Sequence, residues 1–120
     1  MKILQVINSL GSGGAEIFAV NLSIELNKLN NNNVHFLIYH GISDKKGQYL
    51  KKLLNQSGVT LHNLNIRNKY LKFLCPIIIA LKIAAIRPNI VHSHLDQSDL
   101  FVYLSSFIYK ASAKYVRTLH

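Results

Sequence analysis

The sequence predicts an α/β fold, in which a parallel sheet of about five strands, in the order 3-2-1-4-5, carries helices on both faces. Two observations support this prediction. Short apolar runs alternate with segments of helical periodicity along the 120 residues, and the connections between the apolar runs are too long for hairpins. Because strand–helix–strand crossovers are right-handed, this alternation gives a parallel sheet. The hydrophobic fraction of 49% supports one domain, residues 1–120, with its own core.

The first half of the chain shows three strand patterns and two helix patterns with recognisable ends. The asparagine run at 30–33 stops the first helix, because asparagine favours turns. Asp44 can cap the second helix, and Gly58 stands where a helix C-terminus commonly places glycine. The expected elements are a strand at 2–8, a helix at 15–29, a strand at 34–40, a helix at 45–56 and a strand at 59–64.

The second half adds a long apolar helix, a strand, a further helix and a last strand. Pro76 can begin or break the apolar helix, which follows Lys69 and runs to Ile86. Pro88 then prevents its continuation. The remaining expected elements are a strand at 90–94, a helix at 98–110 and a strand at 114–119.

A glycine-rich loop, Gly11-Ser12-Gly13-Gly14-Ala15-Glu16, joins the first strand to the first helix. Free N–H groups at a helix start attract anions, commonly a phosphate. The dinucleotide fingerprint fits poorly, because Glu16 occupies its last glycine position and His40 stands where a ribose-binding acid belongs. The loop therefore suits a diphosphate held in another manner than NAD, and a tight turn without a ligand is the alternative.

Histidines end two strands that reach the same rim of the predicted sheet as this loop. His92 and His94 close the fourth strand, and His120 closes the fifth. The first two share a face of the strand and could hold a metal with Asp96, but no further cysteine or carboxylate cluster supports a metal site. We favour hydrogen bonding to substrate hydroxyls or phosphate, with Asp96 as a further substrate-binding candidate at the start of the next helix. The alternative is a structural role, with one histidine buried and the other at the rim.

The charge balance is strongly basic, with 14 basic residues against five acidic ones and a net charge of +9. A helical projection of residues 67–87 predicts one apolar core face and an opposite face that is both basic and apolar, a combination suited to an anionic bilayer. Cover by another part of the protein is the alternative, and no nucleic-acid motif is present. The predicted core face contains Phe73, Leu74, Ile77, Ile78, Leu81, Ala84 and Ala85, and the predicted membrane-facing residues are Lys69, Lys72, Ile79, Lys82 and Ile83.

Together these segments resemble the N-terminal domain of a family 4 glycosyltransferase of the GT-B fold. The resemblance covers the whole chain and rests on three stretches in order and spacing, residues 6–16 (VINSLGSGGAE), 87–94 (RPNIVHSH) and 116–120 (VRTLH). It implies two Rossmann-like domains that face each other across a cleft. It also implies transfer of a hexosyl group from a nucleotide sugar, usually with retention of configuration at the anomeric carbon.

The resemblance implies roles for individual residues. Gly13 and Gly14 would lie against the donor diphosphate and the acceptor, with Glu16 beginning the helix behind them. His94 would line the acceptor side, and His120 would be the catalytic residue beside the donor sugar and the leaving phosphate. No cofactor is implied beyond the nucleotide-sugar donor.

The family's C-terminal nucleotide-sugar domain, with its Glu-x7-Glu motif, is missing from the sequence, so we expect this domain to act in cis or in trans. The implied acceptor is a saccharide or a lipid-linked sugar in cell-surface glycan synthesis. The expected location is the cytoplasm, peripheral on the inner face of the plasma membrane. The alternatives are a non-catalytic membrane-peripheral subunit of a split glycosyltransferase, or another nucleotide-binding Rossmann-like domain.

Overall fold

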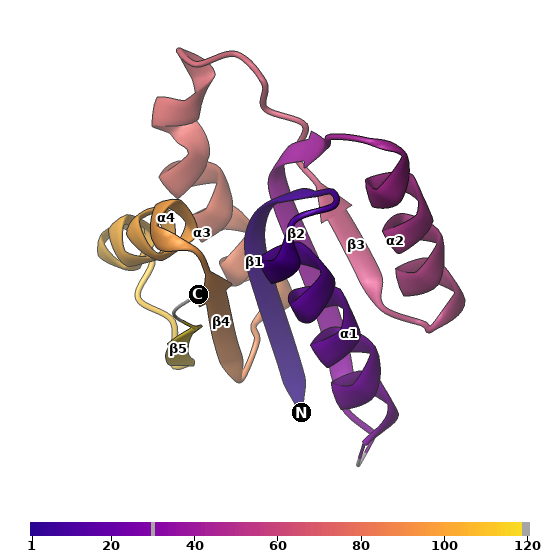
Figure 1. Ribbon diagram of the computed structural model, residues 1–120. Helices are drawn as coiled ribbons and strands as arrows, with labels where there is room; N and C mark the ends of the chain where they lie inside the picture. Colours follow the sequence, from indigo (N-terminus) through magenta and orange to yellow (C-terminus); the bar gives the residue numbers. More distant parts are fainter. Residues whose placement is uncertain (30, 119–120) are drawn as a thin grey trace.

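The computed structural model describes residues 1–29 and 31–118. It shows one parallel sheet in the order β3-β2-β1-β4-β5, which confirms the predicted fold class and strand order (Figure 1). The strands are β1 (Lys2–Leu10), β2 (Asn33–Ile42), β3 (Thr60–Asn63), β4 (Ile90–His94) and β5 (Lys114–Thr118). The helices are α1 (Gly14–Lys28), α2 (Lys45–Gln56), the short 3₁₀ helix η1 (Leu71–Leu74), α3 (Cys75–Ile86) and α4 (Asp96–Ile108).

Two apolar layers cover the sheet, one on each face. Alternate residues of β1 point to opposite faces, so Ile3 and Ile7 join the core under α1 and α2, whereas Leu4 and Val6 join the core under α3 and α4. All four of these side chains are buried. The central strand is therefore mostly apolar on both faces, as the run at residues 2–8 indicated, because helices cover both of its faces.

Most predicted boundaries are confirmed within two residues. The Asp44 side chain caps α2 by accepting a hydrogen bond from the Gly47 amide at 2.9 Å, and Gly58 follows α2 with a φ of +80°. The helix α4 begins at Asp96, two residues before the predicted start, because the chain turns into the helix directly after β4. β1 continues to Leu10, so the glycine loop is shorter than the sequence pattern indicated.

The face of α3 that packs on the sheet is the opposite of the predicted one. Ile79 and Ile83 are fully buried, whereas Phe73 is 83% exposed and Leu81 is 64% exposed. The assignment of Ile79 and Ile83 to a membrane-facing side is therefore wrong. The physical reason is that α3 is apolar around its whole circumference, so periodicity alone cannot choose its buried side.

The basic residues of the predicted membrane-facing side are placed differently from these isoleucines. Lys69 is exposed in the segment before η1, Lys72 lies within η1, and Lys82 is half-buried on α3. In the part of the chain that the structure describes, no helix has the length and apolar character needed to cross a membrane.

Candidate functional site at the ends of the parallel strands

The glycine loop lies at the carboxyl end of β1 and leads into α1. Gly13 is the N-cap of α1, with an extended backbone and no side chain that caps the helix by a hydrogen bond. A Cβ built on Gly13 would lie 3.2 Å from the Glu16 Oε1, so this carboxylate stands beside the helix start. A side chain added at Gly14 would meet nothing within 4 Å, whereas one at Gly11 would overlap the Ser43 hydroxyl and the Glu16 carboxylate. Gly11 is thus required by packing, and Gly14 leaves the backbone open to a ligand.

Glu16 stands in the first turn of α1, directly behind the loop. Its Oε1 accepts a hydrogen bond from the Ser9 hydroxyl at 3.4 Å, and its Oε2 is buried without a hydrogen-bond partner among the described residues. Burial raises the pKa of Glu16, the Ser9 bond opposes this shift, and the negative charge of Asp44 raises the pKa further. The carboxyl group therefore takes up a proton more readily than an exposed glutamate.

Asp44 fastens the glycine loop to the start of α2. Its Oδ2 accepts hydrogen bonds from the Ser12 amide at 3.2 Å and the Ser12 hydroxyl at 3.0 Å. The Gly47 amide, first of all, and then the Ser12 groups lower the pKa of Asp44, so this carboxylate stays ionised. The cap on α2 was predicted, but the link to Ser12 was not, because it joins residues 32 positions apart.

The two histidines of β4 form a polar cluster under α1. His92 and His94 lie on the same face of the strand, with ring centroids 4.2 Å apart. The Nε2 of His94 lies 2.6 Å from the Oε1 of Gln5, and its ring meets the edge of Phe18. His92 bonds the Thr118 hydroxyl of β5. These contacts join β1, β4 and β5 close to the strand ends.

The His94 side chain is fully buried, as is that of Gln5. Its predicted place at the end of β4 is confirmed, but the imidazole lies inside the domain and not on an open acceptor wall. Gln5 was missed by sequence reasoning, since a glutamine in an apolar strand gives no signal of its partner 89 residues away. Among the described residues, no group of three histidine, cysteine or acidic side chains is placed to hold a metal ion.

The turn between β4 and α4 is strained. Leu95 has a φ of +74° and a ψ of 153°, a conformation that side chains other than glycine rarely adopt. A strained backbone of this kind costs about 1–3 kcal/mol and concentrates at functional sites. Asp96 follows as the exposed first residue of α4. The strain therefore lies at the rim where the sequence predicted substrate-binding residues.

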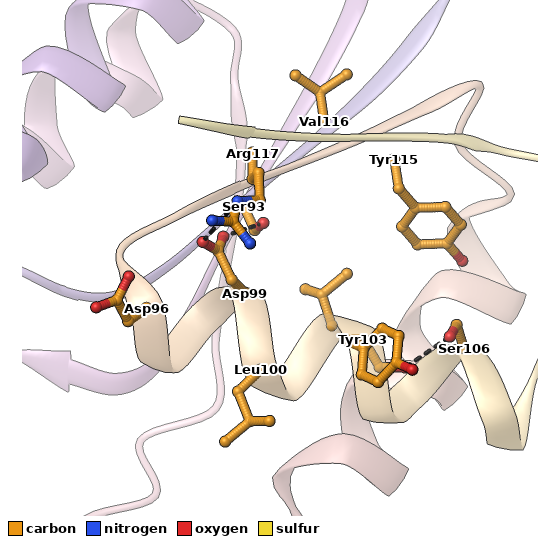
Figure 2. A pocket seen from close by; sticks show the side chains of 10 residues that line it. Ser93, Asp96, Asp99, Leu100, Tyr103, Ser106, Tyr115, Val116 and Arg117 are labelled. Atoms are coloured by element: carbon orange, nitrogen blue, oxygen red, sulfur yellow. Dashed lines mark hydrogen bonds and ion pairs between the residues drawn. The ribbon is translucent and has the colours of Figure 1, made fainter. Parts of the chain in front are cut away.

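A cavity of about 580 Å³ lies between α4 and β5, away from the glycine loop. Figure 2 shows Asp99 and Arg117 turned toward each other at one end of it, with Tyr103 and Tyr115 further along. Ser93 donates a hydrogen bond to Asp99 at 2.5 Å, and the Arg117 Nε lies 3.7 Å from the same carboxylate. These polar groups link β4, α4 and β5, and they leave the Oδ2 of Asp99 buried without a hydrogen-bond partner among the described residues.

These features together define a parallel α/β domain whose strand order reverses between β1 and β4. In such sheets the carboxyl ends of the strands at this switch point are the usual place for a ligand. The structure brings Gly13, Gly14 and Glu16 to this rim beside the end of β4, where His94 and Asp96 lie. The catalytic prediction for His120 lies outside the described residues.

Comparison with known proteins supports this fold. No protein-family model matches the chain, and no curated protein matches it at a significant level. Among solved structures, the chain is similar to a glycosyltransferase from Rickettsia africae ESF-5, with a TM-score of 0.71 and 19% sequence identity. The match covers 99% of this chain and 29% of that glycosyltransferase. The chain thus shares its fold with about three-tenths of that glycosyltransferase.

Proposed function

We propose that the chain is the acceptor-side, Rossmann-like domain of a GT-B glycosyltransferase that transfers a hexosyl group from a nucleotide sugar. The observation that carries this proposal is the match of 99% of the chain to a glycosyltransferase, combined with an open glycine loop at the start of α1. The proposal includes the family 4 resemblance, the saccharide or lipid-linked acceptor and a partner nucleotide-sugar domain in cis or in trans.

In the proposed reaction the acceptor hydroxyl oxygen forms a bond to the anomeric carbon, and the bond from that carbon to the diphosphate oxygen breaks. The acceptor proton is released, and the nucleoside diphosphate leaves with the bonding electron pair. The outward N–H groups at the start of α1, after Gly13, would stabilise the negative charge that develops on this leaving group. Exposure of Gly14 would allow the diphosphate to approach them closely.

The two carboxyl groups at the loop are compatible with an anionic guest. Asp44 accepts hydrogen bonds from the Ser12 and Gly47 amides, so amide dipoles partly neutralise its charge. Burial raises the pKa of Glu16, which reduces the charge that this residue presents to a diphosphate. In the proposed complex Glu16 would exchange hydrogen bonds with a hydroxyl group of the acceptor.

The histidines would have different roles. His94 is buried against Gln5, so it would support the rim from within and not touch the acceptor. His120 keeps the catalytic role that the resemblance implies, beside the donor sugar.

Saturation-transfer NMR on the 120-residue chain tests the proposal with a panel of UDP-, GDP- and ADP-hexoses, inorganic pyrophosphate and NAD. We expect one nucleotide sugar to bind with a dissociation constant in the millimolar range, about −4 kcal/mol, and to be displaced by pyrophosphate. Binding of NAD without binding of any nucleotide sugar would refute the proposal and favour a dinucleotide-binding domain. Failure of every nucleotide sugar to bind at 10 mM, roughly ten times that constant, would also refute it.

A further inference from the structure

An exposed apolar surface rises beyond the ends of the strands. Figure 1 shows the segment after β3, which includes η1 and the start of α3, standing out past the ends of β1 and β2. We call it the η1–α3 surface. It consists of the exposed side chains of Tyr70, Leu71, Phe73, Leu74, Ile77 and Leu81.

The fold does not use these side chains for its own core. Cys75, Ile79 and Ile83 from the other side of α3 fill the layer under the sheet and are fully buried. The outer residues are left facing solvent in a contiguous run, and an exposed apolar patch of this kind is typical of a surface that binds something.

The charge around this surface is of one sign. Residues 45–95 contain nine of the 14 basic residues and none of the five acidic ones, while the remaining 69 residues carry five of each. The whole net charge of +9 therefore comes from this stretch. Arg67, Lys69 and Lys72 immediately adjoin the apolar side chains, and the Lys69 ammonium lies 5.5 Å from the centre of the Tyr70 ring.

A second exposed apolar group lies on α4 and has a different setting. Leu104 and Phe107 are exposed there, but the first turn of the same helix carries Asp96 and Asp99. The exposed Lys110 follows the helix, so the charge along this α4 surface is mixed, whereas the charge around the η1–α3 surface is of one sign.

We propose that the η1–α3 surface docks onto an anionic lipid bilayer. Phe73, Leu74 and Ile77 enter the boundary between headgroups and acyl chains, while Lys69 and Lys72 lie among the lipid phosphates. Aliphatic side chains next to basic ones suit this boundary, whereas single-stranded nucleic acid requires aromatic stacking platforms along a groove. The docked orientation brings the strand-end rim to the membrane.

The docking itself is independent of the proposed glycosyl transfer. Its consequence for the acceptor rests on the proposed function, because a rim held at the bilayer would favour an acceptor carried by a lipid. The two proposals can fail separately, since vesicles without any glycan test the docking and nucleotide sugars in solution test the transferase.

Co-sedimentation with sucrose-loaded vesicles tests the docking. Vesicles contain phosphatidylcholine alone or with one-third phosphatidylglycerol, in 100 mM salt. Each basic residue near an anionic surface contributes roughly fivefold to the partition coefficient, so Lys69→Gln/Lys72→Gln should weaken binding to anionic vesicles roughly 30-fold. Phe73→Ser should weaken it about tenfold or more through the lost apolar burial.

Matched controls make the same kinds of substitution outside the η1–α3 surface, to test whether the location of the apolar and basic side chains matters. Phe107→Ser removes a phenylalanine of similar exposure, 72% against 83% for Phe73, from α4. Lys28→Gln/Lys114→Gln removes the same charge at the opposite end of the strands, where α1 ends and β5 begins. Both controls should bind anionic vesicles within twofold of the wild type, and circular dichroism should show native helix content in all four variants.

Three results would overturn the proposal. The first is equal, negligible binding of the wild type to anionic and neutral vesicles. The second is a loss in the Phe107 or Lys28/Lys114 controls as large as in the test variants. The third is a Phe73→Ser variant that binds vesicles as the wild type does but has lost another interaction of the wild type. That interaction would be concentration-dependent self-association in analytical ultracentrifugation or tight binding of a single-stranded oligonucleotide.

Discussion

Substitution of Gly14 separates a ligand-binding role of the glycine loop from a purely conformational one. Gly14 is the first residue of α1, and an added Cβ would meet no atom within 4 Å. Its backbone is helical, so alanine can adopt the same conformation without strain. Gly14→Ala therefore removes no contact in the folded chain, and Gly14→Val extends the perturbation by two methyl groups into the space where a diphosphate would lie.

The expected effects on stability and binding have opposite signs. Replacing a glycine by alanine at a compatible position raises the free energy of unfolding by about 0.4–1 kcal/mol, because the unfolded chain loses conformational freedom. The melting temperature should rise by roughly 2–6 °C. A side chain over the helix start would displace the diphosphate from one amide group. Each charge-assisted hydrogen bond contributes about 1.5–3 kcal/mol, so affinity should fall about 10- to 100-fold.

Gly47 provides the matched control in the same region. An added Cβ there would overlap the Leu10 carbonyl oxygen, so Gly47→Ala should lower the free energy of unfolding by about 1–3 kcal/mol. Thermal denaturation and saturation-transfer NMR with the nucleotide sugar that binds the wild type measure both quantities. An unchanged affinity in Gly14→Val would refute the diphosphate role of the loop. A Gly14→Ala protein less stable than the wild type would show that the loop needs glycine for its own conformation.

Two further predictions concern stability. Because the pKa of Glu16 is raised in the folded chain, its ionised form destabilises the fold, and Glu16→Gln should raise the free energy of unfolding at pH 7. This gain should vanish as the pH falls below about 4.3, the pKa of an unfolded glutamate, because Glu16 is then protonated in both states. Urea denaturation across pH 3.5–7.5 measures this difference, and a gain independent of pH would contradict the assigned cause. On α3, Ile83→Ala should cost about 2–5 kcal/mol, whereas Leu81→Ala should change stability by less than about 0.5 kcal/mol; equal losses in thermal denaturation would show that the buried face is misassigned.

Much of the fold could be predicted because its signals are local. The apolar run of β1, the Asp44 cap and Gly58 each act within a few residues, so they placed strands and helix ends to within two positions. The parallel sheet followed from the right-handed crossover rule applied to alternating strands and helices, and the strand order followed from the Rossmann-like class that the resemblance implied. Because the sheet is parallel, the carboxyl ends of its strands meet at one rim, and this placed the glycine loop and Asp96 at the same end of the sheet.

Contacts between distant segments could not be predicted in the same way. The bond from His94 to Gln5 and the bond from Ser12 to Asp44 join residues far apart in the chain. The first of them puts the imidazole inside the domain, although the strand pattern had placed it correctly at the end of β4. Whether a side chain at a strand end is buried or exposed depends on the residues that pack over it, and these come from segments that only the folded chain brings together.

The sequence by itself determined the α/β class, the positions of the strands and helices and the position of the glycine loop, because hydrophobic periodicity and turn residues act over short distances. Tertiary structure alone decided which face of α3 is buried, because a helix that is apolar all round has no preferred side until it meets the sheet. That decision turned Ile79 and Ile83 inward and left Phe73 and Leu81 outside, beside a segment without acidic residues.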